Sequence, residues 1–399
     1  MTVTVIDSIM GSGKTSFAIQ TMKNAPIDKK FIYITPFLSE VQRIKESMPE
    51  RNFKEPNVRH GKGTKLKSLK RLVAEGENIA TTHSLFSLID EELEQLLGWG
   101  NYTLIVDEVM EVIHQLKLKP DDIKVLQKSE LVEIEEGTNR VIWKAEPELN
   151  TQYNEVKEYA LSGNLYSVNG TAFVWNFPVS IFGLFDEVII MTYMFDGQLQ
   201  KYYYDYHNID YNKQSVIQAD GVYKLVPYSK EDRSKYKELI NIYEGHLNEI
   251  GDKNSLSKGW FENPYNKSKI TKLKNALYSY IRNDQKAKQD EVLWTTFKDY
   301  RTKLQGKGFT KSFLSFTTRA TNEFKDKSVL AFCLNRFMIP IEKQFFTQRD
   351  IKVDQDLLAL SDLLQWIFRS RIREGQPIEI YIPSKRMRTL LYKWLDGEL

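Results

Sequence analysis

The sequence predicts an α/β protein built on parallel sheets, and three observations support this. An apolar strand at the start of the chain runs through a glycine-containing turn, residues 8–15, into an apolar helix. A second apolar strand ends in two adjacent carboxylates, Asp107 and Glu108. The last hundred residues again alternate short apolar strands with amphipathic helices. We therefore expect two α/β halves, over residues 1–200 and 201–399.

Composition places the chain among ordinary globular proteins. Its 399 residues are 41% hydrophobic and 27% charged, which is typical of that class. No apolar run approaches the roughly 18 residues of a membrane span, and the start lacks a signal-peptide pattern, so we expect a cytoplasmic protein without a membrane partner. The single cysteine, Cys333, excludes an internal disulfide. A net charge of +3 leaves nucleic-acid binding to be judged from local patterns.

The turn after the first strand has the residues of a phosphate-binding loop. Gly11 and Gly13, with Ser12 between them, allow backbone N–H groups to curl around an anion, and the next helix adds its positive N-terminus. Lys14 can reach the β- and γ-phosphates of a nucleotide, and the Thr15 hydroxyl can hold Mg²⁺. The alternative is a Gly/Ser turn that happens to precede Lys-Thr. The flanking strand and helix favour the nucleotide site.

Polar residues follow two further strands of this half. They are Thr35 and Pro36 after one strand, and Thr81, Thr82 and His83 after the other. Open α/β sheets bind ligands at the carboxyl ends of their strands, so these groups could contact sugar or phosphate. The simpler alternatives are that Thr35 and Pro36 only end a strand, and that the other three residues only cap a helix.

The strand that ends in Asp107 and Glu108 suits metal-dependent hydrolysis. The first carboxylate can hold Mg²⁺ through water, and the second can activate the attacking water. An Asp-Glu pair is weak evidence by itself. Together with Lys14, Thr15 and the strand and helix pattern between them, the joint signal is strong.

The remaining pattern predicts an insertion in each half. Residues 125–148 alternate in polarity and turn at Gly137, which predicts a β-hairpin, and a strand ending at Thr192 then closes the first half. Residues 228–290 are mostly polar helix in which lysines alternate with aromatic residues. Single-stranded nucleic acid favours that mixture, because bases stack on rings while lysines meet phosphates. An amphipathic insertion with its aromatic residues in a core is the simpler interpretation.

Near the end of the chain, the sequence predicts one helix over residues 357–373. Arg369 and Arg373 are four apart and would share a face, while Arg371 would point elsewhere. Arginines from a second domain can stabilise the charge of a γ-phosphate that is bound on a first domain. A basic surface helix is the alternative, but it does not explain Gln365 and the apolar residues beside it.

Taken together, these motifs resemble those of superfamily 2 helicases over nearly the whole chain, and they are most similar to the small DNA helicases encoded by bacteriophages. Ser8 stands where the general phosphate-loop motif has its first glycine, a change that the helicase variant permits. Val109 and Met110 replace the last two residues of the DEAD/DEAH box that Asp107 and Glu108 begin. The resemblance implies two RecA-like P-loop domains with parallel sheets, with a β-hairpin insertion in the first and a mostly helical insertion in the second.

The resemblance also implies roles for individual residues. ATP and Mg²⁺ would be bound by Gly11, Ser12, Gly13, Lys14, Thr15 and Asp107, with Thr15 and Asp107 at the metal. The catalytic residues would be Glu108, Gln365, Arg369 and Arg373, and Thr192 would couple hydrolysis to movement. Nucleic acid would be contacted by Thr35, Pro36, Thr81, Thr82, His83, Arg319, Thr321 and Asn322.

The function that this implies is an ATP-dependent DNA helicase or translocase serving phage replication or recombination. We expect a monomer that acts on single-stranded or forked DNA in the cytoplasm of a bacterial host, with replication proteins as candidate partners. Two alternatives stay open: a nucleic-acid-stimulated ATPase that remodels or loads a protein–DNA complex without unwinding, and an RNA helicase. The few residues before the phosphate loop leave little room for the adenine-reading motif of DEAD-box RNA helicases.

Overall fold

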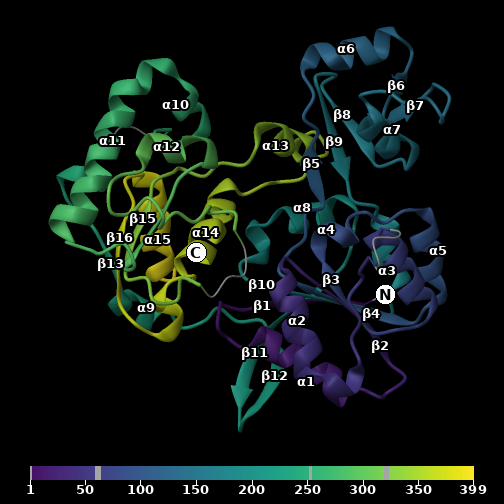
Figure 1. The fold of residues 1–399 in the computed structure, drawn as a ribbon, viewed down its shortest axis with the longest axis horizontal. Coiled ribbons are helices and arrows are strands. Elements are labelled where there is room, and N and C mark those ends of the chain that lie inside the picture. Colours follow the sequence, from purple (N-terminus) through teal and green to yellow (C-terminus); the bar gives the residue numbers. More distant parts are fainter. Residues whose placement is uncertain (1, 59–63, 251–253, 319–322) are drawn as a thin grey trace. The chain divides into compact units, whose positions relative to one another are not determined.

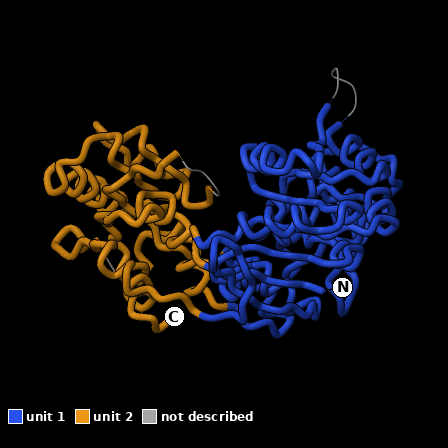
Figure 2. The backbone as a smooth tube through the Cα atoms, turned by 90° about the horizontal axis from the view of Figure 1, so that it is seen from below, with its two compact units in different colours: residues 1–8, 12–229, 339–353 blue, residues 9–11, 230–338, 354–399 orange. Residues whose placement is uncertain are grey.

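The computed structural model describes residues 2–58, 64–250, 254–318 and 323–399 (Figure 1). Two compact units are present (Figure 2). Unit 1 comprises Met1–Ser8, Ser12–Ser229 and Ile339–Val353, and unit 2 comprises Ile9–Gly11, Lys230–Met338 and Asp354–Leu399.

The division falls later in the chain than the expected boundary after residue 200. The reason is strand pairing, because β11 (Asn212–Ala219) pairs in parallel with β1 (Thr2–Asp7), and β12 (Val222–Pro227) pairs antiparallel with β11. The segment between residues 201 and 229 therefore completes the sheet of unit 1.

The core of unit 1 is a seven-stranded sheet in the order β12-β11-β1-β10-β4-β2-β3. Its other strands are β2 (Lys30–Thr35), β3 (Ile79–Thr82), β4 (Tyr102–Asp107) and β10 (Glu187–Thr192). All neighbours pair in parallel except β11 and β12. Strands β1, β2, β3, β4 and β10 are buried almost throughout, as expected where helices cover both faces. This confirms the predicted α/β class with parallel sheets.

Helices connect and cover these strands. They are α1 (Lys14–Asn24), α2 (Leu38–Ser47), α3 (Lys65–Ala74), α4 (His83–Phe86), α5 (Glu91–Trp99) and α8 (Leu199–Tyr206), with 3-10 turns at Pro49–Arg51, Val179–Leu184 and Phe195–Gly197. Ala18 and Met22 of α1 are buried and pack with Ile6 of β1 in one core cluster. This packing fixes α1 directly after the turn that follows β1.

The chain between β4 and β10 forms a small insertion with its own sheets. Its elements are β5 (Ile113–Gln115), α6 (Pro120–Lys128), β6 (Val132–Ile134), β7 (Val141–Trp143), α7 (Asn154–Leu161), β8 (Leu165–Val168) and β9 (Ala172–Asn176). The predicted hairpin is present as β6 and β7, but the insertion is larger, because β5, β9 and β8 form a separate antiparallel sheet.

One segment from late in the sequence also belongs to unit 1. Helix α13 (Pro340–Thr347) packs on this insertion and on α8. Phe345 lies edge-on to Tyr166 of β8, with 5.9 Å between ring centroids, and Phe346 lies 5.8 Å from Tyr202 of α8. Aromatic packing therefore attaches α13 to the insertion.

Unit 2 contains a four-stranded parallel sheet in the order β13-β16-β15-β14. The strands are β13 (Ile240–Ile242), β14 (Val292–Thr295), β15 (Val329–Phe332) and β16 (Ile378–Tyr381). The helices are α9 (Ser234–Leu239), α10 (Lys258–Glu262), α11 (Lys267–Ser279), α12 (Arg301–Leu304), α14 (Gln355–Ile367) and α15 (Lys385–Leu395), and a π-helical turn spans Tyr280–Asp284. Three more 3-10 turns span His246–Asn248, Pro264–Asn266 and Lys298–Tyr300.

The expected helical insertion at 228–290 therefore also supplies a sheet strand, β13. Cys333 is fully buried beside β14 in the core of unit 2, and burial raises the pKa of its thiol. A packed, unreactive thiol follows from that environment.

The predicted helix over residues 357–373 is wrong at its end. Helix α14 stops at Ile367, and a separate 3-10 turn spans Arg371–Glu374. Ser370 caps this turn, since its Oγ accepts a hydrogen bond from the backbone N–H of Ile372, and serine favours such caps. Phe313 forms only an isolated parallel bridge with Trp294 of β14.

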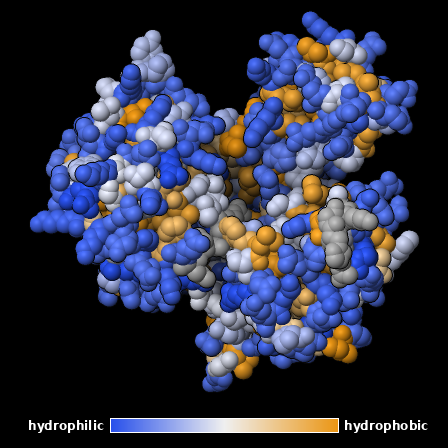
Figure 3. Space-filling model, in the orientation of Figure 1, coloured by the Kyte–Doolittle hydropathy of each residue, from blue (hydrophilic) through white to orange (hydrophobic). Residues whose placement is uncertain are grey.

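Hydrophilic residues cover most of the face drawn in Figure 3. None of the helices in the described ranges is long and apolar enough to cross a membrane.

Candidate nucleotide site

Most of the sequence-predicted residues of unit 1 gather at one edge of its sheet. Asp7 of β1 is in register with Thr192 of β10, and Met191 of β10 is in register with Asp107 of β4. Thr35 and Thr82, the last residues of β2 and β3, form another pair in register. These strands are parallel, so their carboxyl ends lie at the same edge, where open α/β sheets bind ligands.

The turn after β1 has the backbone of a phosphate-binding loop. Gly11 and Gly13 have positive φ angles of 84° and 96°, which favour glycine. A Cβ atom at Gly13 would lie 2.1 Å from Cε1 of Tyr223, so a side chain does not fit there. No side chain caps the N-terminus of α1 at Gly13, and among the described residues the buried Oγ of Ser12 has no hydrogen-bond partner. Uncapped N–H groups at a helix N-terminus suit an anion.

Ser8 has a structural role that glycine would lack. Its backbone N–H donates to the carbonyl of Thr192 at 3.0 Å, and its Oγ accepts from the N–H of Val216 at 2.9 Å. The hydroxyl therefore links the end of β1 to β11. Lys14, the predicted phosphate-binding lysine, donates from Nζ to the carbonyl of Ser8 at 2.5 Å.

The carboxylates at the end of β4 have unusual surroundings. Oδ2 of Asp107 accepts a 2.8 Å hydrogen bond from the Tyr33 hydroxyl. Burial, followed by the negative charge of Glu108, raises the pKa of Asp107 to about 7, while the Tyr33 hydrogen bond and the charge of Lys14 lower it. A bound divalent cation would favour the ionised form further.

Glu108 adopts a strained backbone conformation. Its φ angle is 64°, in the left-handed region, and its N–H donates to the carbonyl of Met191 at 2.9 Å. Its Oε2 atom is buried without a hydrogen-bond partner in the described part of the chain. Strain of this kind costs about 1–3 kcal/mol and persists where the surroundings impose it, often at functional sites. An unsatisfied buried carboxylate oxygen likewise suits a ligand or a water that the site binds.

No group of three His, Cys, Asp or Glu side chains in the described ranges could hold a metal ion by itself. Mg²⁺ commonly binds through one or two carboxylates together with substrate phosphates. The donors near the loop, the Asp107 carboxylate and the Thr15 hydroxyl, fit that second type of site.

Asp7 is a residue of this edge that the sequence patterns did not single out. Its carboxylate accepts backbone hydrogen bonds from Met194 at 2.8 Å and Phe195 at 3.0 Å, and Nζ of Lys213 lies 3.6 Å away. Burial raises the pKa of Asp7, and Lys213 and the two N–H groups lower it. Asp7 thus ties the segment after Thr192 to the strand that enters the phosphate loop.

Thr192 itself is fully buried. Its Oγ1 accepts a 2.9 Å hydrogen bond from Nε2 of Gln198, which also donates to the carbonyl of Tyr193. The predicted coupling position is therefore held by side-chain hydrogen bonds at the edge that carries the phosphate loop.

The predicted nucleic-acid contacts of unit 1 flank this edge. Thr35 and Thr81 are buried, and Oγ1 of Thr35 has no hydrogen-bond partner within the described residues. Thr82 caps α4 by accepting from the N–H of Leu85 at 3.4 Å, which is the simpler role considered for it. Pro36 and His83 are partly exposed. Contact of these residues with nucleic acid stays a prediction, and Arg319, Thr321 and Asn322 lie outside the described residues.

The predicted catalytic residues near the end of the chain, Gln365, Arg369 and Arg373, are all in unit 2. Gln365 is buried in α14 and donates to Oγ of Ser361 at 3.4 Å. Arg369 follows the end of that helix and is 8% exposed, whereas Arg373 is exposed on the 3-10 turn. Arg371 donates from Nε to the carbonyl of Pro377. Arg369 and Arg373 therefore do not share a helical face, because the helix ends at Ile367.

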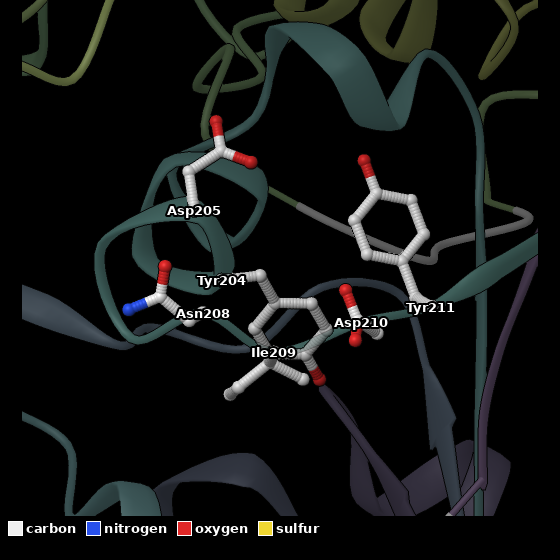
Figure 4. A pocket seen from close by; sticks show the side chains of 6 residues that line it. All are labelled: Tyr204, Asp205, Asn208, Ile209, Asp210 and Tyr211. Carbon is white, nitrogen blue, oxygen red and sulfur yellow. The ribbon is translucent and has the colours of Figure 1, made fainter.

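Figure 4 shows a pocket of about 360 Å³ on unit 1, lined by Tyr204, Asp205, Asn208, Ile209, Asp210 and Tyr211. Its lining comes from the end of α8 and the segment before β11, with no residue of the phosphate loop. Asp205 pairs with Lys201, and Asp210 is exposed. Two carboxylates do not suit a phosphate, so this pocket is separate from the candidate nucleotide site.

The chain resembles two solved structures over most of its length. One is the structure of S. tokodaii Xpd4, whose sequence is 14% identical to this chain. The match covers 100% of this chain and 94% of the Xpd4 chain, with a TM-score of 0.45. The crystal structure of the DUF1998 helicase MrfA bound to DNA and AMPPNP is 8% identical, covers 99% of this chain and 48% of that one, and has a TM-score of 0.35.

Sequence comparison gives a closer relationship. Residues 113–175 match the YonV middle domain, and residues 234–395 match the YonV C-terminal Rossmann-like domain. The SPbeta prophage-derived uncharacterized protein YonV of Bacillus subtilis (strain 168) is 44% identical over 411 residues, covering 99% of both chains. The chain therefore belongs to the YonV family.

Proposed function

We propose that this protein is an ATP-dependent helicase or translocase that acts on DNA. One observation supports the ATPase activity: the phosphate loop, Asp107 and the strained Glu108 lie at the same edge of the sheet. The nucleic-acid part is supported by the sequence motifs at Thr35 and Thr81. The prophage origin of the YonV relative supports a role on phage DNA.

The residues of unit 1 would divide the chemistry among them. The loop N–H groups and Lys14 would bind the phosphates, and Thr15 and Asp107 would hold Mg²⁺, which neutralises phosphate charge when bound. Glu108 would accept a proton from the attacking water, for which its unpartnered Oε2 is suited. On the sequence motif alone, we assign charge stabilisation to Gln365, Arg369 and Arg373.

The test is the ATPase rate of Lys14→Ala and Glu108→Gln proteins. We expect each rate to fall by about 100-fold or more, since both groups would act on the transferring phosphoryl group or its nucleophile. Lys23→Ala, at the exposed end of the same helix α1, and Glu111→Gln, three residues after Glu108, are the matched controls. Wild-type hydrolysis by the Lys14→Ala protein would exclude the proposed site.

A specific observation favours a second candidate, a nucleic-acid-stimulated ATPase that remodels a complex without unwinding. Val109 and Met110 stand in place of the polar end of the box and are buried at 4% and 2% exposure. The N–H of Met110 donates to Oε1 of Gln200, so this segment has a structural role. ATPase stimulated by DNA with no strand displacement or translocation at saturating ATP would support this candidate. Stronger stimulation by RNA would instead indicate an RNA helicase.

A further inference from the structure

A second pocket, of about 430 Å³, lies on the insertion of unit 1 and differs in charge from the acidic pocket of Figure 4. Its lining includes the turn of the β6–β7 hairpin with Arg140, Tyr166 of β8, Tyr206 of α8, and Arg349 after α13. Four segments thus contribute two arginines and two tyrosines to the lining of one hollow.

Backbone and side-chain hydrogen bonds hold these segments together. Arg140 and Tyr166 form an antiparallel bridge, and the N–H of Ser167 donates to the carbonyl of Asn139 at 2.7 Å. The side-chain amide of Gln348, next to Arg349, donates to Oδ1 of Asn169 after β8. These contacts hold the lining segments of the pocket together.

Arg349 is a cation whose surroundings are aromatic. Its guanidinium carbon lies 3.9 Å from the ring centroid of Phe345, 5.3 Å from that of Tyr206 and 5.5 Å from that of Tyr166. Nη1 donates to the carbonyl of Phe345 at 2.9 Å. Within the described residues, the buried Nη2 has no hydrogen-bond partner, and no carboxylate forms an ion pair with Arg349. A partly buried cation without a paired anion is costly, so an anionic ligand would stabilise Arg349.

Arg140 supplies the second positive charge. Its guanidinium lies over Gly163. A Cβ atom at Gly163 would be 2.0 Å from Nη2 of Arg140, so only glycine fits beneath this arginine. Arg140 is exposed and has no carboxylate ion pair within the described part of the chain. One carboxylate, that of Glu135, also lines the pocket, and it accepts from the Thr138 hydroxyl. Two arginines against one glutamate leave the pocket positive.

We propose that this pocket binds a phosphate group of a nucleic-acid strand, through Arg140 and Arg349, with the adjoining sugar or base against Tyr166 and Tyr206. Guanidinium groups form paired hydrogen bonds with phosphate oxygens, and tyrosine rings stack with bases of any sequence. The inference rests on the proposed action on nucleic acid and adds a contact surface on the insertion, distant in sequence from the helicase motifs.

The experiment measures binding of a labelled single-stranded DNA by fluorescence anisotropy without ATP, for wild type and for the Arg140→Gln and Arg349→Gln proteins. Each substitution should weaken binding about tenfold and reduce the slope of log affinity against log salt by about one, because each removes one phosphate contact. Arg71→Gln is the matched control. It removes the same charge from an exposed residue of α3 that pairs with Glu75, and it should bind like wild type.

The outcomes separate this inference from the proposed function. Arg349→Gln also alters ring packing, so the exposed Arg140 carries the decision if the Arg349 variant unfolds. Wild-type binding by Arg140→Gln would overturn the inference and leave the ATPase test with Lys14→Ala untouched. Failure of the wild-type protein to bind any strand would instead remove the nucleic-acid part of the proposed function, and the inference with it.

A second measurement distinguishes the source of the phosphate. Thermal unfolding with dTMP or inorganic phosphate tests whether the pocket binds a free phosphate group. The strand proposal would be overturned if dTMP raised the unfolding temperature of the wild type but not of Arg140→Gln, while both proteins bound the strand equally well. The pocket would then be assigned to a free nucleotide. Unequal strand affinity, with little protection by dTMP, would support it.

Discussion

The hydroxyl of Tyr33 donates a 2.8 Å hydrogen bond to Oδ2 of Asp107, so a fully buried ring on β2 orients the carboxylate at the end of β4. Tyr33 is two residues before Thr35, in the strand next to β4. The predicted metal-binding carboxylate is therefore positioned by a neighbouring strand.

Replacing Tyr33 with phenylalanine should weaken the use of Mg²⁺. The change removes an interaction that lowers the pKa of Asp107 and leaves a buried acceptor atom unpaired. We expect the Mg²⁺ concentration for half-maximal ATPase to rise about fivefold, in line with the loss of one supporting hydrogen bond to a ligand. Tyr102→Phe is the control, because that hydroxyl donates to the carbonyl of Glu77 at 3.1 Å, away from the carboxylates. An equal effect of both substitutions on the Mg²⁺ dependence would contradict the assigned role of Tyr33.

Restoring the first glycine of the general loop motif should harm the protein. Ser8→Gly removes the hydroxyl that accepts from the N–H of Val216 and adds backbone freedom. The expected loss is about 1–2 kcal/mol in the free energy of unfolding, which thermal or urea unfolding would measure. Ser8→Thr, which keeps a hydroxyl, is the comparison and should lose less. A Ser8→Gly protein as stable as wild type would show that the β1–β11 link is unimportant.

Gly13→Ala should prevent nucleotide binding. The added Cβ would lie 2.1 Å from Cε1 of Tyr223, and the φ angle of 96° is unfavourable for alanine. Tyr223→Ala removes the clash but not the backbone strain, so the double variant should recover only part of the affinity. Nucleotide affinity measured by a fluorescent ATP analogue checks both steps. Full recovery in the double variant would mean that the clash alone matters.

Strands and strand ends that follow from the local pattern of apolar and polar residues could be predicted from the sequence. Apolar residues predicted the strands β1, β2, β4 and β10, and β4 and β10 end at Asp107 and Thr192, where the sequence predicted their ends. Positions that depend on distant partners were not predictable in this way. Asp7 is a single carboxylate at a strand end, and its hydrogen-bond donors, Met194 and Phe195, come more than 180 residues later.

Two errors have a common physical cause. The apolar spacing of α14 continues to Ile372, which is buried in the 3-10 turn, so the pattern concealed the end of the helix at Ile367. The strands β5 to β9 are only three to five residues long, too short for periodicity to separate them from loops. Tertiary packing decides both cases, as it does for α13.

His207 should make the stability of unit 1 depend on pH. It follows α8, where Nδ2 of Asn176 lies 2.9 Å from its Nε2, and the rings of Tyr203 and Tyr206 pack against it. Burial, and then the charge of Arg349, lower the pKa of His207 to about 4, against about 6.5 in the unfolded chain. The native state then binds fewer protons between these values, so stability is full above about pH 6.5 and falls as the pH drops toward 4.

Because the ring is partly exposed, we expect this effect to be about 1–2 kcal/mol between about pH 7 and pH 5. Hydrogen exchange of the amides in α8 and β9 at the two pH values would measure it locally. His207→Gln should flatten that part of the dependence, while His246→Gln, at an exposed position of unit 2, should keep the wild-type slope. An unchanged slope in His207→Gln would mean that other groups cause the acid sensitivity. A flattened slope would assign the acid sensitivity to His207, beside Arg349. Nucleic acid bound at Arg349 should then also lessen the acid sensitivity, because its negative charge would raise the pKa of His207.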